Sequence, residues 1–430
     1  MELSLPKGTR DFLPEDKIVR DKIVALLKET FELYGYNPLE TPALENFETL
    51  SNKFAGGSEI LKEVYTLEDQ GKRKLGLRYD LTVPFARVIA MNQTIKKPFK
   101  RYQIDRVWRD GPIKLGRYRE FWQCDADVVG IKSMAADAEI LSLASAFFKK
   151  LDLKVTIFVN NRKLMNSLLD FSLIPKEKQE STILSIDKLK KVGVNAVRKE
   201  LEENKLSDDS IAKVLSVFEI SESSNEKLLN RLDEILENKE GIRELRELLN
   251  YAKQFSLDNV KLDISLARGL AYYTSTVLEV FMDDETIKSS LAAGGRFDKM
   301  IGNFLGAKEE IPAVGMSFGL DVLTDAIKLS KKSDGKKSVV EVYIAPIKAL
   351  NESIIILDKL RKAGIKADMD FSSKNITKNL DFADKLKIPY IMIIGEDEIK
   401  KNKIKLKNMA SGKEEILSVE EIIGRVKNEA

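Results

Sequence analysis

Histidine is absent from this chain of 430 residues, and cysteine occurs once, as Cys124. The first absence excludes a histidine base, a Ser-His-Asp triad and a zinc site of the His-Cys type, and the second excludes an intrachain disulfide. Any catalysis must therefore use carboxylates, arginine, lysine, hydroxyl groups, backbone donors or a bound hard cation.

Long apolar runs are also missing, since no segment approaches the roughly 20 apolar residues that a membrane-spanning helix needs. The N-terminal MELSLPKGTRDF lacks the basic and then apolar pattern of a signal peptide. We therefore expect a cytoplasmic protein with no membrane partner. A formal net charge of +3 permits a nucleic-acid partner but does not require one.

Changes in periodicity divide the chain into segments. Residues 16–34 have the apolar spacing of an amphipathic helix, and residues 100–130 alternate with a period of two in two arms, which predicts a β-hairpin. Charged, leucine-rich helices are predicted over about 161–255, and strand-like, glycine-rich segments follow them. The polar run at 328–338 is the predicted linker.

Strands and helices alternate beyond this linker, from VVEVYIAPI to YIMIIG, which is typical of a parallel α/β domain. We therefore predict an α+β protein of two domains. Residues 1–327 form a domain built on an antiparallel sheet, with the helical insertion at about 161–255, and residues 338–430 form the α/β domain.

The predicted hairpin combines charged and aromatic side chains in the run VWRDGPIKLGRYREFWQCDAD, residues 107–127. By parity, aromatic side chains mostly lie on one face, and the other face is lined by Arg101, Gln103, Asp105 and Arg109 in the first arm and by Arg119, Gln123, Asp125 and Asp127 in the second. Two interpretations stay open, a hairpin with one solvated face and the floor of a binding site. The use of arginine favours the second, because a planar guanidinium suits phosphate or carboxylate.

Several blocks of this chain resemble, in order, the histidyl-tRNA synthetase family of class II aminoacyl-tRNA synthetases. Arg109, a short loop, GRYREFWQ and then Asp127 resemble motif 2 of the class. The other matching blocks are the N-terminal signature PKGTRDFLP (6–14), motif 1 in LYGYNPLETPALE (33–45), the amino-acid-binding segment LRYDLTVPFAR (77–87), and the two histidine-specific blocks LARGLAYYTSTVLE (266–279) and AAGGRFD (292–298). Their joint occurrence across nearly the whole chain makes the resemblance strong.

The resemblance implies a function and a nucleotide site. Such an enzyme activates L-histidine with ATP as histidyl-adenylate, with Mg²⁺ and without zinc, and transfers it to tRNA(His) through an anticodon-binding domain. Arg109 and Arg268 are then the catalytic residues, which stabilise charge at the α-phosphate, and Arg117 is a further ATP contact. The magnesium ligands are unknown. Motif 1 implies a homodimer.

The resemblance also implies a histidine pocket. The substrate ammonium needs acceptors, for which Asp80, Gln123 and Asp127 match the family, and Thr82 belongs to the same segment. The imidazole needs a partner on each nitrogen and an aromatic wall, for which Tyr272 and Tyr273 match.

Several residues of the matching blocks can also be explained by structure alone. Asp80 can be a helix cap, the two tyrosines can be ordinary strand residues, Gly294 and Gly295 can form a bulge, and Arg268 can be a surface charge.

The chain departs from the family pattern in four places. Val322 stands where motif 3 has an arginine that contacts ATP, and Gly111 stands where motif 2 commonly has a glutamate. Ala271 replaces an aspartate and Phe297 a tyrosine. These departures leave two rival functions open, a non-catalytic synthetase-like regulatory subunit of histidine biosynthesis and a class II synthetase for glycine, proline or threonine.

The missing histidines have two explanations. A synthetase that charges histidine needs charged histidine for its own synthesis, so a chain without histidine escapes this dependence. Compositional drift in a proteome that uses little histidine would give the same result. The chemistry permits the absence, because every proposed role belongs to Arg, Asp, Gln or Tyr.

Overall fold

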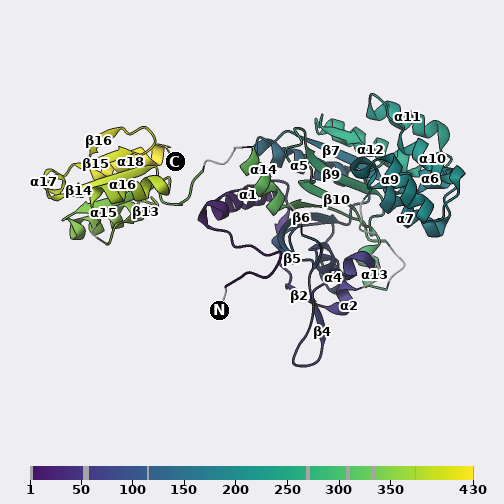
Figure 1. Cartoon of the computed structure of the whole chain (residues 1–430), viewed down its shortest axis with the longest axis horizontal. Helices are drawn as coiled ribbons and strands as arrows, with labels where there is room; N and C mark the ends of the chain where they lie inside the picture. Colours follow the sequence, from purple (N-terminus) through teal and green to yellow (C-terminus); the bar gives the residue numbers. More distant parts are fainter. Residues whose placement is uncertain are drawn as a thin grey trace. The chain divides into compact units, whose positions relative to one another are not determined.

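The structure is a computed structural model that describes residues 3–51, 58–113, 116–267, 272–306, 310–330, 335–372 and 374–429. Contacts between residues separate the chain into two compact units. The larger unit contains residues 1–10 and 23–329, and the smaller contains residues 11–22 and 330–430. Figure 1 shows the course of the chain through both.

An eight-stranded sheet forms the centre of the larger unit. Its strands are antiparallel, except that β1 and β8 at the two edges pair in parallel with their neighbours. In spatial order they are β1 (Asn37–Pro38), β5 (Phe99–Trp108), β6 (Glu120–Val129), β11 (Ala313–Gly319), β10 (Ala292–Arg296), β9 (Thr276–Met282), β7 (Val155–Asn161) and β8 (Val260–Leu262).

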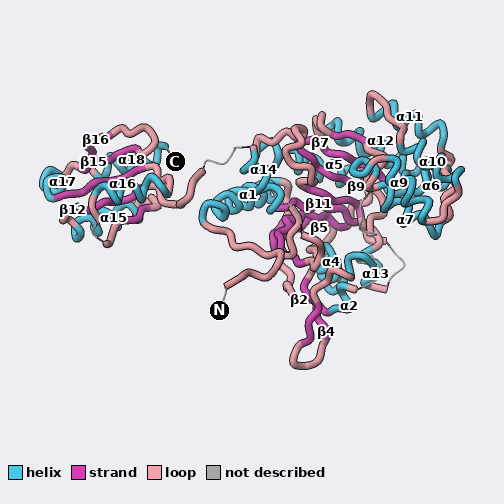
Figure 2. Tube along the Cα trace, in the orientation of Figure 1, coloured by secondary structure: helices cyan, strands magenta, loops and turns pink. Residues whose placement is uncertain are grey.

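One face of this sheet is apolar and is covered by helices α5 (Ala135–Lys150) and α14 (Leu320–Leu329), together with the last turns of α1 (Pro14–Leu33) around Phe31. Figure 2 shows α5 and α14 beside the strands. The aromatic ring of Phe318 on β11 lies 5.9 Å from that of Phe31 and 5.2 Å from that of Phe147, centroid to centroid. Such ring pairs stabilise a core beyond the burial of their area, so helices and sheet are fixed together on this side.

The opposite face of the sheet is overlaid by a second apolar cluster that contains Val83, Phe85, Tyr272, Phe297 and Ile301. Helices α4 (Thr82–Met91) and α13 (Met300–Phe304) contribute to it and contact each other. Beside it lie a three-stranded sheet and two short helices: β2 (Leu44–Asn46), β4 (Lys74–Leu77), β3 (Thr66–Glu68), α2 (Phe47–Leu50) and α3 (Ser58–Leu61).

Seven helices stand between β7 and β8, and Figure 1 shows that they gather at one end of the larger unit. They are α6 (Arg162–Phe171), α7 (Lys176–Ile186), α8 (Leu189–Val192), α9 (Val194–Glu203), α10 (Asp208–Phe218), α11 (Asn225–Ile235) and α12 (Glu240–Gln254). Asn161, Ser207 and Ser224 cap α6, α10 and α11, because their side chains accept hydrogen bonds from backbone N–H groups in the first turn.

The smaller unit contains a five-stranded sheet between helices. Its strands, in spatial order, are β13 (Ala367–Met369), β12 (Val342–Ile347), β14 (Tyr390–Gly395), β15 (Ile404–Asn408) and β16 (Glu414–Leu417). Its helices are α15 (Leu350–Lys362), α16 (Ile376–Lys385), α17 (Glu396–Lys401) and α18 (Val419–Glu429). The first three strands are parallel, as the alternating pattern predicts, but β15 and β16 are antiparallel.

The predicted fold class is confirmed, since an antiparallel sheet with a helical insertion is joined to an α/β unit. Among the described residues, no helix combines the length and the apolar character that crossing a membrane requires. The bulge suggested for Gly294 and Gly295 is wrong, because both residues pair in unbroken register with β9 and β11.

Candidate active site

The polar face of the sheet is built from side chains that the strand register places opposite one another. Arg101 on β5 pairs with Asp127 on β6, and Gln103 pairs with Asp125. Ser317 on β11 is the other neighbour of Asp125. These positions have the parity that the sequence assigned to the polar face, so both arms of the hairpin direct their charges to one side.

Three carboxylates, from Asp80, Asp125 and Asp127, are almost completely buried on this face. The Oδ1 atom of Asp80 accepts a hydrogen bond of 3.0 Å from the backbone N–H of Val83, in the first turn of α4. Asp80 therefore satisfies a backbone donor in the first turn of α4, although the residue at the N-cap position is Leu81. Its Oδ2 atom is buried without a hydrogen-bond partner, and so are Oδ1 of Asp125 and Oε1 of Gln123. Buried acceptors without donors are costly and suit a ligand that brings N–H groups.

Arg101 supplies the positive charge that this arrangement needs. Its Nη2 atom lies 2.7 Å from Oδ2 of Asp127 and donates to the carbonyl of Leu81 at 3.1 Å. Its guanidinium carbon lies 4.4 Å from the ring centroid of Phe85. A buried ion pair is stable only when its geometry is good, so Arg101 fixes the position of Asp127.

Burial changes the acidity of these carboxylates. Burial is the main cause that raises the pKa of Asp80 to about 7 and the pKa of Asp127 to about 7. The charge of neighbouring carboxylates acts in the same direction as burial. The pKa of Asp125 is also raised by burial, although Arg101 and a hydrogen bond from Ser317 oppose the change. Arg101 pairs with one of these carboxylates, while the charges of Arg109 and Arg78 also act on the cluster, and a cationic ligand would add a direct partner.

Two glycines allow the carboxylate of Asp127 and the ring of Tyr273 to lie close against the sheet. Gly315 on β11 pairs with Asp127 on one side and with Gly295 of β10 on the other. A side chain at Gly315 would overlap the carboxylate of Asp127, and one at Gly295 would meet the ring of Tyr273. The ring of Tyr273 and the carboxylate of Asp127 therefore lie over adjacent strands of the sheet. Neighbouring strands are about 5 Å apart.

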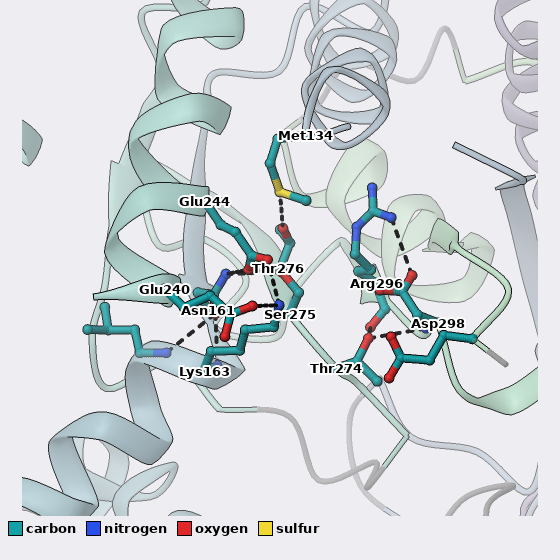
Figure 3. Close-up of polar contacts among 12 residues, drawn as sticks. Met134, Asn161, Lys163, Glu240, Glu244, Thr274, Ser275, Thr276, Arg296 and Asp298 are labelled. Atoms are coloured by element: carbon teal, nitrogen blue, oxygen red, sulfur yellow. Dashed lines mark hydrogen bonds and ion pairs between the residues drawn. The ribbon is translucent and has the colours of Figure 1, made fainter. Parts of the chain in front are cut away.

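Tyr272 and Tyr273 precede β9 in a loop, so the suggestion that they are strand residues is wrong. Their ring centroids are 4.7 Å apart, and the ring of Tyr272 stands edge-on to that of Phe297 at 6.1 Å. Figure 3 shows the polar contacts that hold the residues after them, Thr274 to Thr276. An aromatic pair is thereby brought beside the acidic cluster.

The hairpin loop places arginine at the end of the polar face. The Nε atom of Arg109 donates to the carbonyl of Tyr79 at 2.9 Å, and its charge lowers the pKa of Asp80 in opposition to burial. Thr82 is the first residue of α4 and is partly buried beside these groups. Arg117 is exposed in the loop, so the structure does not bring it into the cluster.

A second arginine reaches the loop from the N-terminal segment. The guanidinium of Arg10 lies 3.4 Å from the ring centroid of Tyr118, and its Nη2 atom lies 2.6 Å from Oδ1 of Asp321. The other oxygen of Asp321 accepts from the backbone N–H of Trp122 at 3.0 Å. Val322, which stands where motif 3 has arginine, lies beside Gly116 of the same loop. Arg10 therefore brings a guanidinium to Asp321, the residue that precedes Val322.

The structure groups most of the predicted site residues. Those that it brings together on the polar face are Asp80, Thr82, Arg109, Gln123, Asp127, Tyr272 and Tyr273. Arg268 lies outside the described residues. Arg101 and Asp125 were noted only by parity, although the cross-strand register pairs Arg101 with the predicted residue Asp127. Ser317, whose hydroxyl accepts from Gln123 at 3.0 Å, has no signal in the sequence.

Metal ligands do not gather at this site. Within the residues that the structure describes, no group of three or more acidic or cysteine side chains is arranged to hold a metal ion. The side chains present therefore do not fit a resident metal without further ligands.

The antiparallel sheet, the acidic cluster on its polar face and the arginine-bearing hairpin together define a class II aminoacyl-tRNA synthetase catalytic domain. The family model described as histidyl-tRNA synthetase matches residues 8–323, and the model described as anticodon binding domain matches residues 341–429. The chain belongs to the histidyl-tRNA synthetase family.

Similar proteins agree with this assignment over nearly the whole chain. A histidine–tRNA ligase 1 of Bacillus cereus is 44% identical over 425 residues, which is 96% of this chain and 95% of that one. The histidine–tRNA ligase of Clostridium tetani is 37% identical over 439 residues, 99% of this chain and 98% of that one. The crystal structure of histidyl-tRNA synthetase from Nostoc sp. PCC 7120 matches with a TM-score of 0.87 at 28% identity, and each chain is covered completely.

The raised pKa values predict how the stability of the ligand-free protein depends on pH. In the unfolded chain an aspartate loses its proton near pH 4, but Asp80 and Asp127 keep theirs up to about pH 7. The native state therefore binds more protons between these values, and the free energy of unfolding falls as the pH rises from about 4 to 7. Asp127→Asn should reduce this fall.

The measurement is the midpoint of urea unfolding at pH 5 and at pH 8. Asp358→Asn, at an exposed carboxylate on α15, is the matched control and should behave as the wild type does. Equal pH dependence in the wild type and Asp127→Asn would contradict the assignment.

Proposed function

We propose that this chain activates L-histidine with ATP to form histidyl-adenylate and pyrophosphate, and then transfers the histidyl group to tRNA(His). The observation that carries the proposal is the cluster of three buried carboxylates, which lies beside two tyrosines on the polar face of the sheet. An amino acid with a cationic ammonium group and a flat side chain matches this arrangement, because the ammonium suits the carboxylates and the flat side chain suits the tyrosine rings.

The ammonium group belongs at the acidic cluster. Its three N–H donors would satisfy buried acceptor atoms on Asp80, Gln123 and Asp127, which support this role by their position. Its positive charge would lower the pKa values that burial has raised, so binding releases protons near neutral pH. Thr82 lies beside Asp80 at the edge of the pocket.

The imidazole belongs against the tyrosines. Tyr272 and Tyr273 offer ring faces to a flat side chain and hydroxyl groups to its nitrogen atoms. Selection of histidine over amino acids of similar size would follow, because buried polar groups stay unpaired when the ligand lacks nitrogen at those positions.

In the first step, a carboxylate oxygen of histidine attacks the α-phosphorus of ATP, and the bond to the bridging oxygen of pyrophosphate breaks. Negative charge develops on the phosphoryl oxygens, for which Arg109 and Arg268 are the proposed stabilising groups and Arg117 a proposed ATP contact. Mg²⁺ bound with ATP would neutralise charge on the leaving pyrophosphate. In the second step, a terminal ribose hydroxyl of the tRNA attacks the activated carbonyl and AMP leaves.

Histidine-dependent exchange between ATP and pyrophosphate tests this function directly. The wild type should catalyse it with histidine, and not with glycine, proline or threonine. A non-catalytic regulatory subunit would show no exchange with any amino acid. That outcome would overturn the proposal.

Asp127→Asn should raise the KM for histidine in this assay by roughly 10- to 100-fold, which is the value of a hydrogen bond to a charged group. The KM for ATP should stay within about twofold, since Asp127 lies at the ammonium end. Arg268→Ala should instead lower the exchange rate by roughly 100- to 1000-fold. Equal changes in both KM values for Asp127→Asn would count against its assignment.

The smaller unit is proposed to bind the anticodon of the tRNA. After β13, Asp370 accepts hydrogen bonds from the backbone N–H groups of Ser372 and Lys374, at 2.8 and 2.6 Å. Phe371 in this segment is 60% exposed, and Lys374 follows three residues later. An exposed aromatic ring near a basic residue suits stacking on an unpaired base.

Phe371→Ala should raise the KM for tRNA in aminoacylation by roughly 5- to 100-fold, which corresponds to the loss of one base stacked on an aromatic ring. The exchange reaction, which needs no tRNA, should be unchanged. Ile416→Ala, at another exposed apolar residue of the same unit, is the control and should leave the KM for tRNA unchanged. A wild-type KM in Phe371→Ala would exclude this loop from the interface.

A homodimer is also proposed, because the segment that resembles motif 1 includes β1 at the edge of the large sheet, where a second chain can extend it. Sedimentation equilibrium at micromolar concentration should give about twice the mass of the 48.6 kDa chain. A mass of one chain under these conditions would contradict the dimer.

A further inference from the structure

A partly buried network centred on Glu244 lies outside the proposed catalytic groups (Figure 3). Lys163 donates to Oε1 of Glu244 at 2.6 Å, and Ser275 and Asn161 donate to Oε2 at 2.7 and 2.8 Å. Asn161 also donates to the hydroxyl of Ser275 at 3.0 Å. One carboxylate therefore joins three segments that are distant in the sequence.

These segments meet where the helical insertion begins and ends. Asn161 is the last residue of β7 and caps α6, the first helix of the insertion. Glu244 lies on α12, the last helix before the chain returns to the sheet. Ser275 lies outside the insertion and directly precedes β9. Its carbonyl accepts a hydrogen bond from the backbone N–H of Arg162 at 2.8 Å.

Ser275 stands two residues after Tyr273, so the network holds the segment that carries the tyrosine pair. On the other side of this segment, the backbone N–H of Thr274 donates to the carbonyl of Arg296 at 2.8 Å, and its hydroxyl accepts from the N–H of Asp298 at 3.1 Å. The tyrosine segment is therefore held by β10 through Thr274 and by the helical insertion through Ser275 and Glu244. A displacement of α12 therefore acts on the tyrosine segment through Glu244.

The carboxylate of Glu244 stays ionised although it is partly buried. Burial alone would raise the pKa of Glu244, but the hydrogen bonds from Lys163, Ser275 and Asn161 outweigh it and hold that pKa below its ordinary value. Glu244 is therefore ionised at neutral pH, where its bonds to the two neutral donors are charge-assisted and strong.

We propose that Glu244 is a positioning residue, which couples the helical insertion to the Tyr272 and Tyr273 pair so that the placement of the insertion sets the affinity for the amino-acid substrate. The proposal rests on the proposed function for the identity of that substrate. It assigns no contact between Glu244 and the substrate, and the effect passes through Ser275.

The chain offers a matched control on the same helix. Glu240 lies one turn before Glu244 and also accepts from Lys163, at 2.7 Å, but its exposed side chain does not reach Ser275. Glu240→Ala and Glu244→Ala each remove one carboxylate from Lys163. Only the second breaks the link to the tyrosine segment.

Glu244→Ala should raise the KM for histidine in ATP–pyrophosphate exchange by roughly tenfold, as expected for a lost charge-assisted hydrogen bond. The KM for ATP should stay within about twofold, and Glu240→Ala should leave both values unchanged. Ser275→Ala should raise the KM for histidine too, and adding it to Glu244→Ala should have little further effect, because both changes break the same link. Glu244→Gln, which keeps an acceptor for Ser275, should partly restore affinity.

Amide hydrogen exchange in the ligand-free protein gives a readout that does not depend on activity. Residues 272–276 should exchange faster in Glu244→Ala than in Glu240→Ala, provided that thermal melting shows both variants folded. Should Glu244→Ala not fold, Glu244→Gln and Ser275→Ala replace it in both measurements. Unchanged amide hydrogen exchange in residues 272–276 overturns the coupling, and so does an equal rise in the KM values for histidine and ATP. A wild type that shows no histidine-dependent ATP–pyrophosphate exchange overturns the proposed function alone.

Discussion

The acidic cluster on the polar face of the large sheet is the constraint on which the site depends. Asp80, Asp125 and Asp127 are buried together, and Arg101 is the buried cation that pairs with one of them. Such an arrangement is costly in an empty protein, because buried charge without a partner is poorly solvated. The apolar face supplies the compensating stability, through aromatic rings that fix helices against the opposite side of the same strands.

The division of the sheet into an apolar and a polar face also explains where small residues are needed. The carboxylate of Asp127 and the ring of Tyr273 can lie directly against the sheet because Gly315 and Gly295 carry no side chains there. Strands alternate their side chains, so the glycines on the polar face cost the apolar face nothing. Stability and binding are thereby assigned to opposite surfaces of one element.

The helical insertion is tied into this arrangement at its base. The chain leaves the sheet at Asn161, and the last helix of the insertion returns a carboxylate, Glu244, to the same point beside Ser275. The tyrosine segment is thus held between the sheet and the insertion. A domain that contributes no residue to the polar face can still act on the tyrosine segment through one partly buried anion.

The sequence by itself determined the fold class, the hairpin with its two faces, and the family, because periodicity and ordered motifs are local signals. By resemblance it also predicted Asp80, Gln123, Asp127 and the tyrosines as candidate site residues. Only the tertiary structure decided that Arg101 pairs with Asp127, that Arg10 reaches Asp321, and that β15 and β16 run antiparallel. These depend on register and on contacts across as many as 311 residues, which no local pattern of apolar and polar residues encodes.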